Sequence, residues 1–176
     1  MDFKRILVPV SGEKADDEAV RLACSLAKKN KARVYVLYVI EVERSLPLEA
    51  AIDSLRRRAE EILEHAERVA EEEADYQVDS QLLQAREAGS AIVEEAVQKG
   101  ADLIVMGFNY KKRFGQFSLG STLPYVLRNA TCRVIVSREP VAPRVEVASG
   151  AVTPRVESRI NGSQRFFMAP GRPREP

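Results

Sequence analysis

The chain has 176 residues, of which 45% are hydrophobic and 30% are charged, and its formal net charge is +1. This length suits a single packed domain, and the hydrophobic fraction is sufficient for a core. The apolar runs are shorter than the roughly 20 residues of a membrane-spanning helix, and the near-neutral charge gives no field for nonspecific nucleic-acid binding, so we expect neither membrane insertion nor a nucleic-acid partner.

The first part of the chain alternates between strand-like and helix-like segments. Residues 5–10, with the sequence RILVPV, form a continuous apolar run that is typical of a strand buried on both faces. Residues 11–12 make a turn, and the acidic residues 16–18 mark the first turn of a helix whose apolar residues recur at helical spacing. The β-branched and aromatic residues of segment 33–40 then predict a second strand.

The same alternation continues through the second part. Residues 48–74 predict a long amphipathic helix, and the more polar segment 77–84 predicts a strand suited to the edge of a sheet. The remaining predicted elements are, in chain order, a helix over 90–99, a strand over 102–106, a glycine-containing loop over 107–120, a helix over 121–129 and a strand over 132–136. This alternation predicts an α/β fold with a five-stranded, doubly wound, mostly parallel sheet and helices on both faces.

Periodicity does not give the order of the strands, but one order has a clear consequence. We predict the order 3-2-1-4-5, in which the sheet changes direction between its first and fourth strands. Ligands of such sheets bind outside the carboxyl ends of the strands at that point. The turn at Ser11 and the loop that begins at Gly107 would then share one crevice.

The composition changes near residue 139. Residues 139–176 carry six of the nine prolines and six arginines against four glutamates, without a sustained apolar period. We therefore predict a folded domain over 1–138 and a disordered tail over 139–176. The tail is either a solvated extension or a docking arm for a protein partner, with residues 166–168 as its apolar anchor.

Cysteine and histidine are scarce. Cys24 and Cys132 make no disulfide framework, and the N-terminal residues lack the pattern of a signal peptide, so we expect reduced thiols in a cytoplasmic protein. Both thiols are predicted to be small buried hydrophobes. His65 is the single histidine and lies in a charged helical stretch, which leaves too few ligands for a zinc site built on His and Cys and no evident catalytic triad.

The loop after the fourth strand has the composition of a phosphate-binding segment. Gly107, Gly115 and Gly120 let a backbone approach an anion closely, and Ser121 and Thr122 add hydroxyl donors at a helix N-terminus. A plain turn followed by a helix N-cap would use the same residues. The Walker A pattern fails because Ser121 stands where its lysine should be, and no G-x-G-x-x-G is present.

Three segments resemble the universal stress proteins: ILVPVSG at 6–12, ADLIVMG at 101–107 and LGSTLPYVLRNATCRVIV at 119–136. The resemblance covers residues 3–138. It implies a doubly wound α/β sheet, a homodimer that forms through the fifth strand at residues 132–137, and in many members a bound ATP or AMP in the crevice described above.

The ATP-binding members of that family share the pattern G-x2-G-x9-G-[S/T]. Gly107 and Gly120 match it, whereas Tyr110 replaces the second glycine, and Ser11 stands where those members usually carry an Asp that touches the adenosine part. The resemblance also implies that the backbone of Val39 meets the adenine edge. The candidate nucleotide site is therefore Ser11, Val39, Met106, Gly107, Asn109, Tyr110, Gly120, Ser121 and Thr122.

Each of these residues has a structural alternative. Val39 and Met106 could simply pack in the core, and Asn109 could cap a turn instead of reaching the ribose or phosphates. Tyr110 could stack on the nucleotide or bond a phosphate. The basic residues 111–113 could neutralise phosphates or form a solvated loop.

Two functions follow from the residues and the resemblance. The first is an adenine-nucleotide-binding regulatory module for ATP or AMP, with or without Mg²⁺, that hydrolyses slowly at most, because no acidic residue lies between Gly107 and Thr122. The second is a nucleotide-free dimeric interaction module, which could regulate a membrane transporter in trans. An adenylyl-transfer or related enzyme is the weakest reading, since no catalytic set is visible.

Overall fold

The computed structural model describes residues 2–48, 53–109, 111–113 and 116–138. The predicted tail and Tyr110 lie outside the described residues. The elements are β1 (Arg5–Val10), α1 (Lys14–Asn30), β2 (Arg33–Glu41), α2 (Asp53–Arg68), the π-helical turn η1 (Val69–Glu73), β3 (Asp79–Ala85), α3 (Ala88–Lys99), β4 (Leu103–Phe108), β5 (Lys111–Arg113), β6 (Gln116–Ser118), α4 (Thr122–Asn129) and β7 (Arg133–Arg138).

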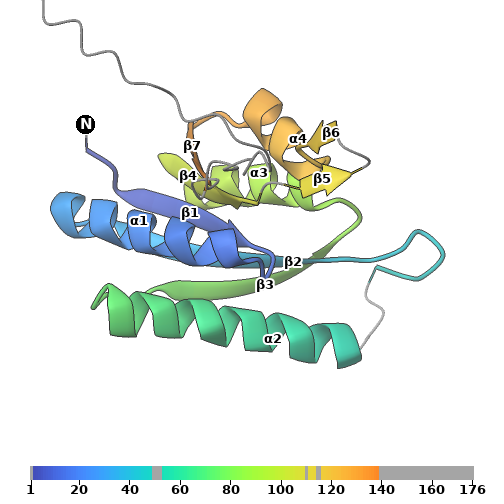
Figure 1. Ribbon diagram of the computed structural model, residues 1–176, viewed down its shortest axis with the longest axis horizontal. Helices are drawn as coiled ribbons and strands as arrows, with labels where there is room; N and C mark the ends of the chain where they lie inside the picture. The colour runs from blue at the N-terminus through green and yellow to red at the C-terminus, as the bar shows by residue number, and fades with distance from the viewer. Residues whose placement is uncertain (1, 49–52, 110, 114–115, 139–176) are drawn as a thin grey trace, which may run out of the picture. The chain divides into compact units, whose positions relative to one another are not determined.

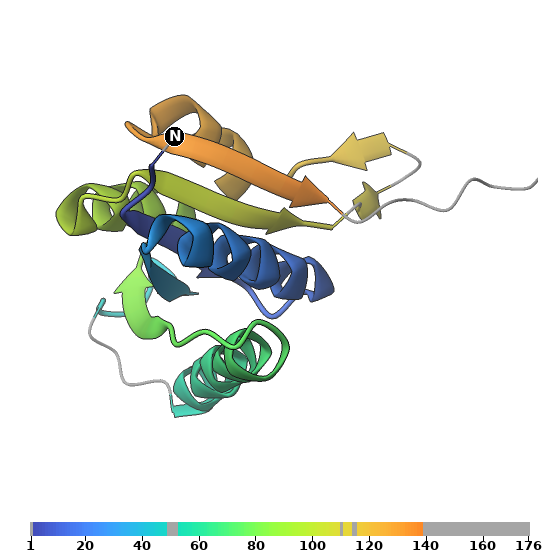
Figure 2. The ribbon, with the colours of Figure 1, turned by 90° about the vertical axis from the view of Figure 1, so that its left-hand side faces the viewer.

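The five main strands form one parallel sheet in the order β3-β2-β1-β4-β7. Since β7 is the fifth strand of this sheet along the chain, the predicted order 3-2-1-4-5 and the α/β class are confirmed. Helices α1 and α2 cover one face, and α3 and α4 cover the other (Figures 1 and 2). The direction of winding reverses between β1 and β4, so a ligand crevice is expected outside their carboxyl ends.

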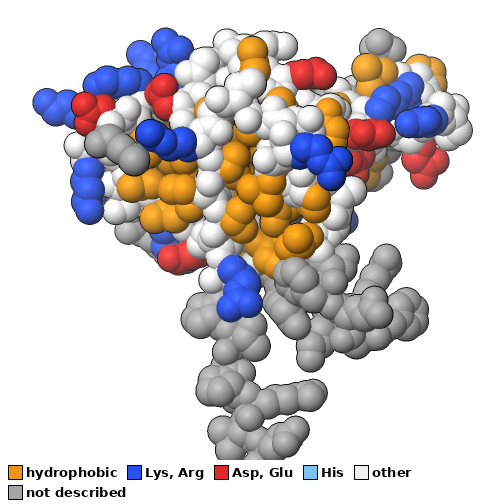
Figure 3. Space-filling model, turned by 90° about the horizontal axis from the view of Figure 1, so that it is seen from above, with side chains coloured by type: hydrophobic (Ala, Val, Ile, Leu, Met, Phe, Trp, Pro, Cys, Tyr) orange, Lys and Arg blue, Asp and Glu red, His pale blue; other side chains and the backbone are white. Residues whose placement is uncertain are grey.

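The sheet ends in β3 on one side and β7 on the other. The predicted edge position of the polar third strand is thus confirmed. Beside β7, large hydrophobic side chains remain exposed on α4 and on the strand itself, and Figure 3, which looks down on these elements, shows hydrophobic side chains gathered on this face. They include Tyr125, Leu127 and Val136. None of the helices among the described residues is long and apolar enough to cross a membrane.

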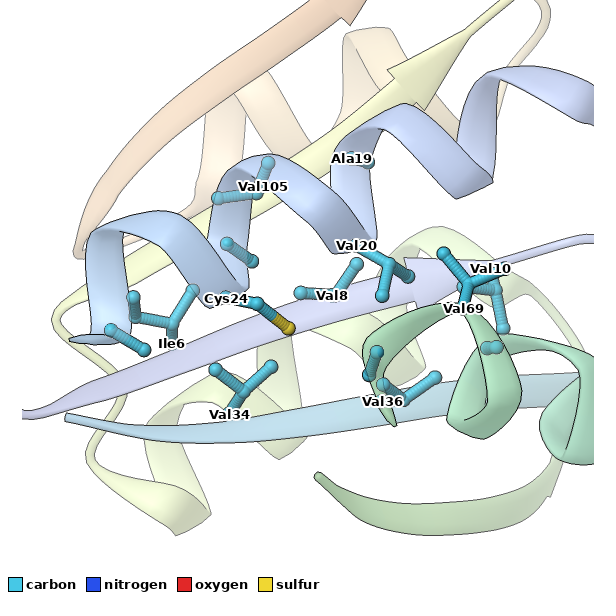
Figure 4. Close-up of a cluster of buried hydrophobic side chains, with 14 of the residues drawn as sticks. Ile6, Val8, Val10, Ala19, Val20, Cys24, Val34, Val36, Val69 and Val105 are labelled. Atoms are coloured by element: carbon cyan, nitrogen blue, oxygen red, sulfur yellow. The ribbon is translucent and has the colours of Figure 1, made fainter. Parts of the chain in front are cut away.

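Alternation along the central strands divides the core between the two faces. In β1, Ile6, Val8 and Val10 face the layer of α1 and α2, as Figure 4 shows for that cluster, whereas Leu7 packs with the residues of α3 and α4. Both sets are almost completely buried, which is the reason that the strand reads as a continuous apolar run. Cys24 of α1 belongs to the first layer and is 0% exposed, as predicted for a small hydrophobe.

Two predicted elements differ from the structure. The long helix predicted over 48–74 is α2 followed by the wider turn η1, with residues 49–52 outside the described residues. Ala66 in α2 and Val69 and Ala70 in η1 are all buried. The spacing of these apolar residues therefore does not reveal the change from an α-helix to a π-helical turn. The loop predicted over 107–120 contains the antiparallel pair β5–β6, whose three-residue strands are too short to show a period.

Several boundaries also move, each for a visible reason. β4 continues through Gly107 and Phe108, because both residues pair with the end of β7. Helix α3 begins at Ala88 instead of residue 90, because a Glu41 carboxylate oxygen accepts the Ala88 N–H at 2.7 Å. Cys132 was predicted to be buried at the start of the last strand, but it is half-buried in the turn before β7.

Candidate functional site

A pocket of about 680 Å³ opens at the carboxyl ends of β1, β2 and β4, where the winding of the sheet reverses. Its volume lies within the range of about 300–1,000 Å³ typical of small-molecule sites. The lining residues are Pro9, Val10, Ser11, Glu13, Asp16, Leu37, Tyr38, Val39, Ile40, Glu41, Leu55, Ala88, Ile92, Met106, Gly107, Phe108, Asn109, Leu119, Gly120, Thr122 and Leu123. Its polar lining comes mainly from the turn after β1, the end of β4 and the start of α4, and its apolar lining comes from both strands and helices.

The structure brings most of the predicted site residues together in this pocket. Those that line it are Ser11, Val39, Met106, Gly107, Asn109, Gly120 and Thr122. Ser121 is the N-cap of α4, is exposed, and does not line the pocket. Tyr110 lies outside the described residues, so its predicted place at the crevice is not described.

Gly107 holds β4 against the start of α1. A Cβ atom on this residue would lie 2.3 Å from the Ala15 carbonyl oxygen and 2.8 Å from the Asp16 nitrogen. Both neighbours are backbone atoms, so no side chain could turn aside to make room. The glycine that the sequence suggested for a phosphate loop thus has a packing function, because it allows β4 to contact the first turn of α1.

The turn after β1 is organised around the Asp16 carboxylate. One of its oxygens accepts the Ser11 N–H at 2.8 Å, the Ser11 hydroxyl at 3.2 Å and the Glu13 N–H at 2.9 Å. Asp16 is 7% exposed, although it belongs to the first turn of a surface helix. Burial raises the pKa of Asp16, and the hydrogen bonds from Ser11, Glu13 and Gly12 offset part of this rise because they stabilise the charged form.

A hydrogen bond joins the two loops that face each other across the pocket. The Asn109 amide donates to the Glu13 carboxylate at 2.8 Å, which links the end of β4 to the turn after β1. Glu13 is also the N-cap of α1 and forms a capping box with Asp16. Asn109, which the sequence placed either at a ligand or at a turn, therefore makes a bridge between loops in the structure.

Helix α4 begins at the far side of the pocket. Gly120 has a φ of +68°, a conformation that favours glycine, and a Cβ added there would meet nothing within 4 Å. Ser121 makes no side-chain capping bond, and Thr122 lines the pocket at the first helical position. The N–H groups that begin a helix carry partial positive charge, so this end of the pocket suits an anion.

All acidic residues of the lining accept hydrogen bonds from backbone N–H groups at the start of a helix. Glu13 and Asp16 cap α1, and Glu41 caps α3. Among the lining residues that the structure describes, none is Lys, Arg or His. The basic segment of the sequence occupies β5, next to the undescribed Tyr110.

Sequence reasoning missed the contribution of Glu13, Asp16 and Glu41 to this pocket. It assigned Asp16 only to an acidic first helical turn, whereas the structure makes it the acceptor for the strand end. The spacing Glu13-x-x-Asp16 is that of a capping box and could have indicated an ordered turn. Nothing comparable in the sequence marks Glu41, because its partner Ala88 is 47 residues away.

Comparison with known proteins gives one consistent result. The model of the universal stress protein family matches residues 2–138. A universal stress protein of Methanocaldococcus jannaschii is 34% identical over 144 residues, which cover 78% of this chain and 84% of the relative. A universal stress protein of Thermus aquaticus is 34% identical over 141 residues, which cover 77% of this chain and 99% of the relative.

Solved structures have the same fold. The universal stress protein of Archaeoglobus fulgidus in complex with dAMP has a TM-score of 0.60 at 23% identity and covers 77% of this chain and 98% of its own. A universal stress protein in complex with cAMP has a TM-score of 0.60 at 20% identity, and the match covers 78% of this chain and 98% of that protein's chain. The family match over residues 2–138 and the two relatives at 34% identity show that the chain belongs to the universal stress protein family.

Proposed function

We propose that the domain binds an adenine nucleotide, ATP or AMP, in the pocket between β1 and β4 and acts as a regulatory module. The observation that carries this proposal is the convergence of seven predicted site residues on one pocket at the point where the sheet reverses. The relatives that were solved with dAMP and cAMP support the same ligand class.

The two ends of the pocket suit the two ends of such a ligand. Val39, Met106 and Phe108 give an apolar surface for a purine base. Thr122 at the start of α4 offers a hydroxyl donor, and the partial positive charge of the first helical turn suits a phosphate. Glu13 and Asp16 are engaged in capping bonds, so neither is placed as a free general base, and we expect slow hydrolysis at most.

The test is calorimetric titration of the full chain with ATP and AMP, each with and without Mg²⁺. Thr122→Val removes the hydroxyl that lines the pocket at the start of α4. Ser121→Ala, which removes a neighbouring hydroxyl that does not line the pocket, and Ser80→Ala, at an exposed strand position, are the matched controls. A lost bond to a charged phosphate should weaken binding about tenfold or more. No heat and no thermal shift with either nucleotide would overturn the proposal.

A homodimer through β7 is the second part of the proposal. Within the described sheet β7 pairs with β4 alone, and its Val136 is 38% exposed, next to an α4 whose Leu127 is 52% exposed. Exposed edges of this kind tend to be paired or protected. Analytical sedimentation tests the dimer. The wild type should sediment as a dimer, Val136→Asp should weaken this dimer, and the control Val97→Asp, at an exposed position of α3, should not. A monomeric wild type would refute the dimer without affecting the nucleotide proposal.

The interaction module without nucleotide is the alternative that this exposed face favours. It predicts an intact dimer, no effect of ATP or AMP on stability, and unchanged assembly in Thr122→Val. The calorimetric and sedimentation measurements together separate the two functions.

A further inference from the structure

Ser11 directly follows the last residue of β1, and it places a hydroxyl group at the pocket. Ser11 is exposed and lines the pocket, while its partner Asp16 is buried beneath it. The Ser11 hydroxyl donates to Asp16 Oδ2 at 3.2 Å, and the Ser11 and Glu13 N–H groups donate to the same oxygen. Three donors thus fix the position of this carboxylate.

This arrangement sets the direction of any hydrogen bond that Ser11 makes to a ligand. A serine hydroxyl has one proton and two acceptor lone pairs, and an ionised carboxylate can only accept. Because Asp16 takes the single hydroxyl proton, the lone pairs of Ser11 Oγ are what remain for the pocket. A ligand group opposite Ser11 must then donate, and an acceptor placed there would face another acceptor.

We propose that Ser11 is a specificity-determining acceptor in this pocket and that Asp16 is the positioning residue that keeps it one. The inference rests on the proposed nucleotide function and specifies which ligand chemistry the pocket selects. An adenine nucleotide carries donors of the required kind in its 6-amino group and in its 2′ and 3′ hydroxyls. A nucleotide that lacks the matching donor is discriminated against at this position.

The ligands that test this differ from AMP by one donor each. IMP replaces the 6-amino group with a carbonyl oxygen, and 2′-deoxy-AMP and 3′-deoxy-AMP each lack one hydroxyl. For the wild-type full chain, we expect one of these three ligands to bind about three- to tenfold more weakly than AMP, the ratio expected for one neutral hydrogen bond. The weakened ligand identifies the donor that meets Ser11.

The variants separate the acceptor from the residue that orients it. In Ser11→Ala the discrimination should disappear, so that the weakened ligand and AMP bind with similar affinity. In Asp16→Ala the hydroxyl regains a proton that it can donate to the carbonyl oxygen of IMP, so an AMP-to-IMP ratio should fall toward one. A ratio set by a missing ribose hydroxyl should persist in this variant, because Ser11 keeps its acceptor lone pairs. Asp16→Asn should restore the ratio, since an amide oxygen can accept the same three bonds. Asp16→Ser, which also withdraws the carboxylate, replaces Asp16→Ala if that variant fails to fold, and melting curves establish which variants are folded.

The possible failures are distinguishable. If neither AMP nor ATP binds the wild type, the proposed function is wrong and the Ser11 assignment falls with it. If AMP binds but all three analogues bind equally well, or if Ser11→Ala keeps the wild-type ratio, the Ser11 assignment alone is wrong. If IMP is the weakened ligand and Asp16→Ala and Asp16→Ser both keep its ratio, Asp16 does not orient Ser11.

Discussion

Gly107 packs so closely on Ala15 that the two backbones leave no room for a single carbon atom between them. A Cβ on Gly107 would lie 2.3 Å from the Ala15 carbonyl oxygen and 2.5 Å from the carbonyl carbon. Because Ala15 lies in the first turn of α1 and Gly107 lies near the end of β4, this contact fixes the helix that carries Asp16 relative to the strand that carries Met106. The geometry of the pocket therefore depends on it.

We expect Gly107→Ala to destabilise the fold and to weaken ligand binding together. The added carbon must push the first turn of α1 away from β4, at a cost of roughly 1–3 kcal/mol for overpacking. Urea unfolding measures the loss, and calorimetry measures the binding. Gly89→Ala is the control, because its added Cβ would meet side-chain atoms of the exposed Tyr125 instead of backbone, and the residue does not line the pocket. Wild-type stability in Gly107→Ala would show that α1 and β4 are not held as described.

Most of the fold could be predicted from the sequence, and the reason is physical. Strands β1 and β4 are buried on both faces, so their apolar runs are continuous, and the helices show an apolar period on their buried side. Periodicity shows which faces of a strand are buried and not which strands are neighbours, so it does not provide the predicted order 3-2-1-4-5. The pairing of β1 with both β2 and β4 confirms it.

The interior of the site was harder to predict than its location. Glycines, hydroxyls and a helix start mark the place where an anion could bind, and Gly107, Gly120 and Thr122 do line the pocket. The Asp16 carboxylate reaches back across the turn to Ser11, and this contact exists only once strand and helix are placed. The β5–β6 hairpin was missed for a simpler reason, since its strands have three residues each.

Glu13→Gln tests whether phosphates approach the bridge between Asn109 and Glu13. A glutamine oxygen can still accept from the Asn109 amide, so the bridge is kept while one negative charge leaves the pocket. We expect ATP affinity to rise roughly two- to fivefold relative to adenosine, as for an exposed charge interaction below about 1 kcal/mol. Glu18→Gln, on the exposed part of α1 beside Arg21, is the control. A fall in ATP affinity would indicate that the Glu13 charge assists binding.

The two thiols are expected to differ in reactivity. Burial raises the pKa of Cys24 to about 11, with Lys28 offsetting a small part, and the residue is 0% exposed. Burial also raises the pKa of Cys132, but this residue is half-buried. At neutral pH a disulfide reagent should therefore label Cys132 slowly and Cys24 only after unfolding. In Cys132→Ser, labelling of the remaining thiol should follow the urea unfolding curve, and rapid labelling in the native protein would contradict the buried position of Cys24.

The buried Asp16 should leave a measurable pH dependence on stability. Burial raises its pKa in the folded protein above its ordinary value, so the folded state binds a proton more tightly than the unfolded state does. Its stabilising effect is then complete below roughly pH 4, the ordinary range of an aspartate, and is lost as the pH rises through the higher folded pKa. Asp16→Asn keeps the hydrogen-bond acceptor but cannot titrate.

The wild type should accordingly gain stability relative to Asp16→Asn as the pH falls from 7 toward 4. Urea unfolding free energies of the two proteins at several pH values give the difference, and Asp53→Asn, at an exposed position in the first turn of α2, supplies the baseline for removing an aspartate. The sign of the slope decides the question. If the wild type loses stability relative to Asp16→Asn over this range, the three hydrogen bonds outweigh burial, and the carboxylate is held in its charged form more firmly in the fold than in water.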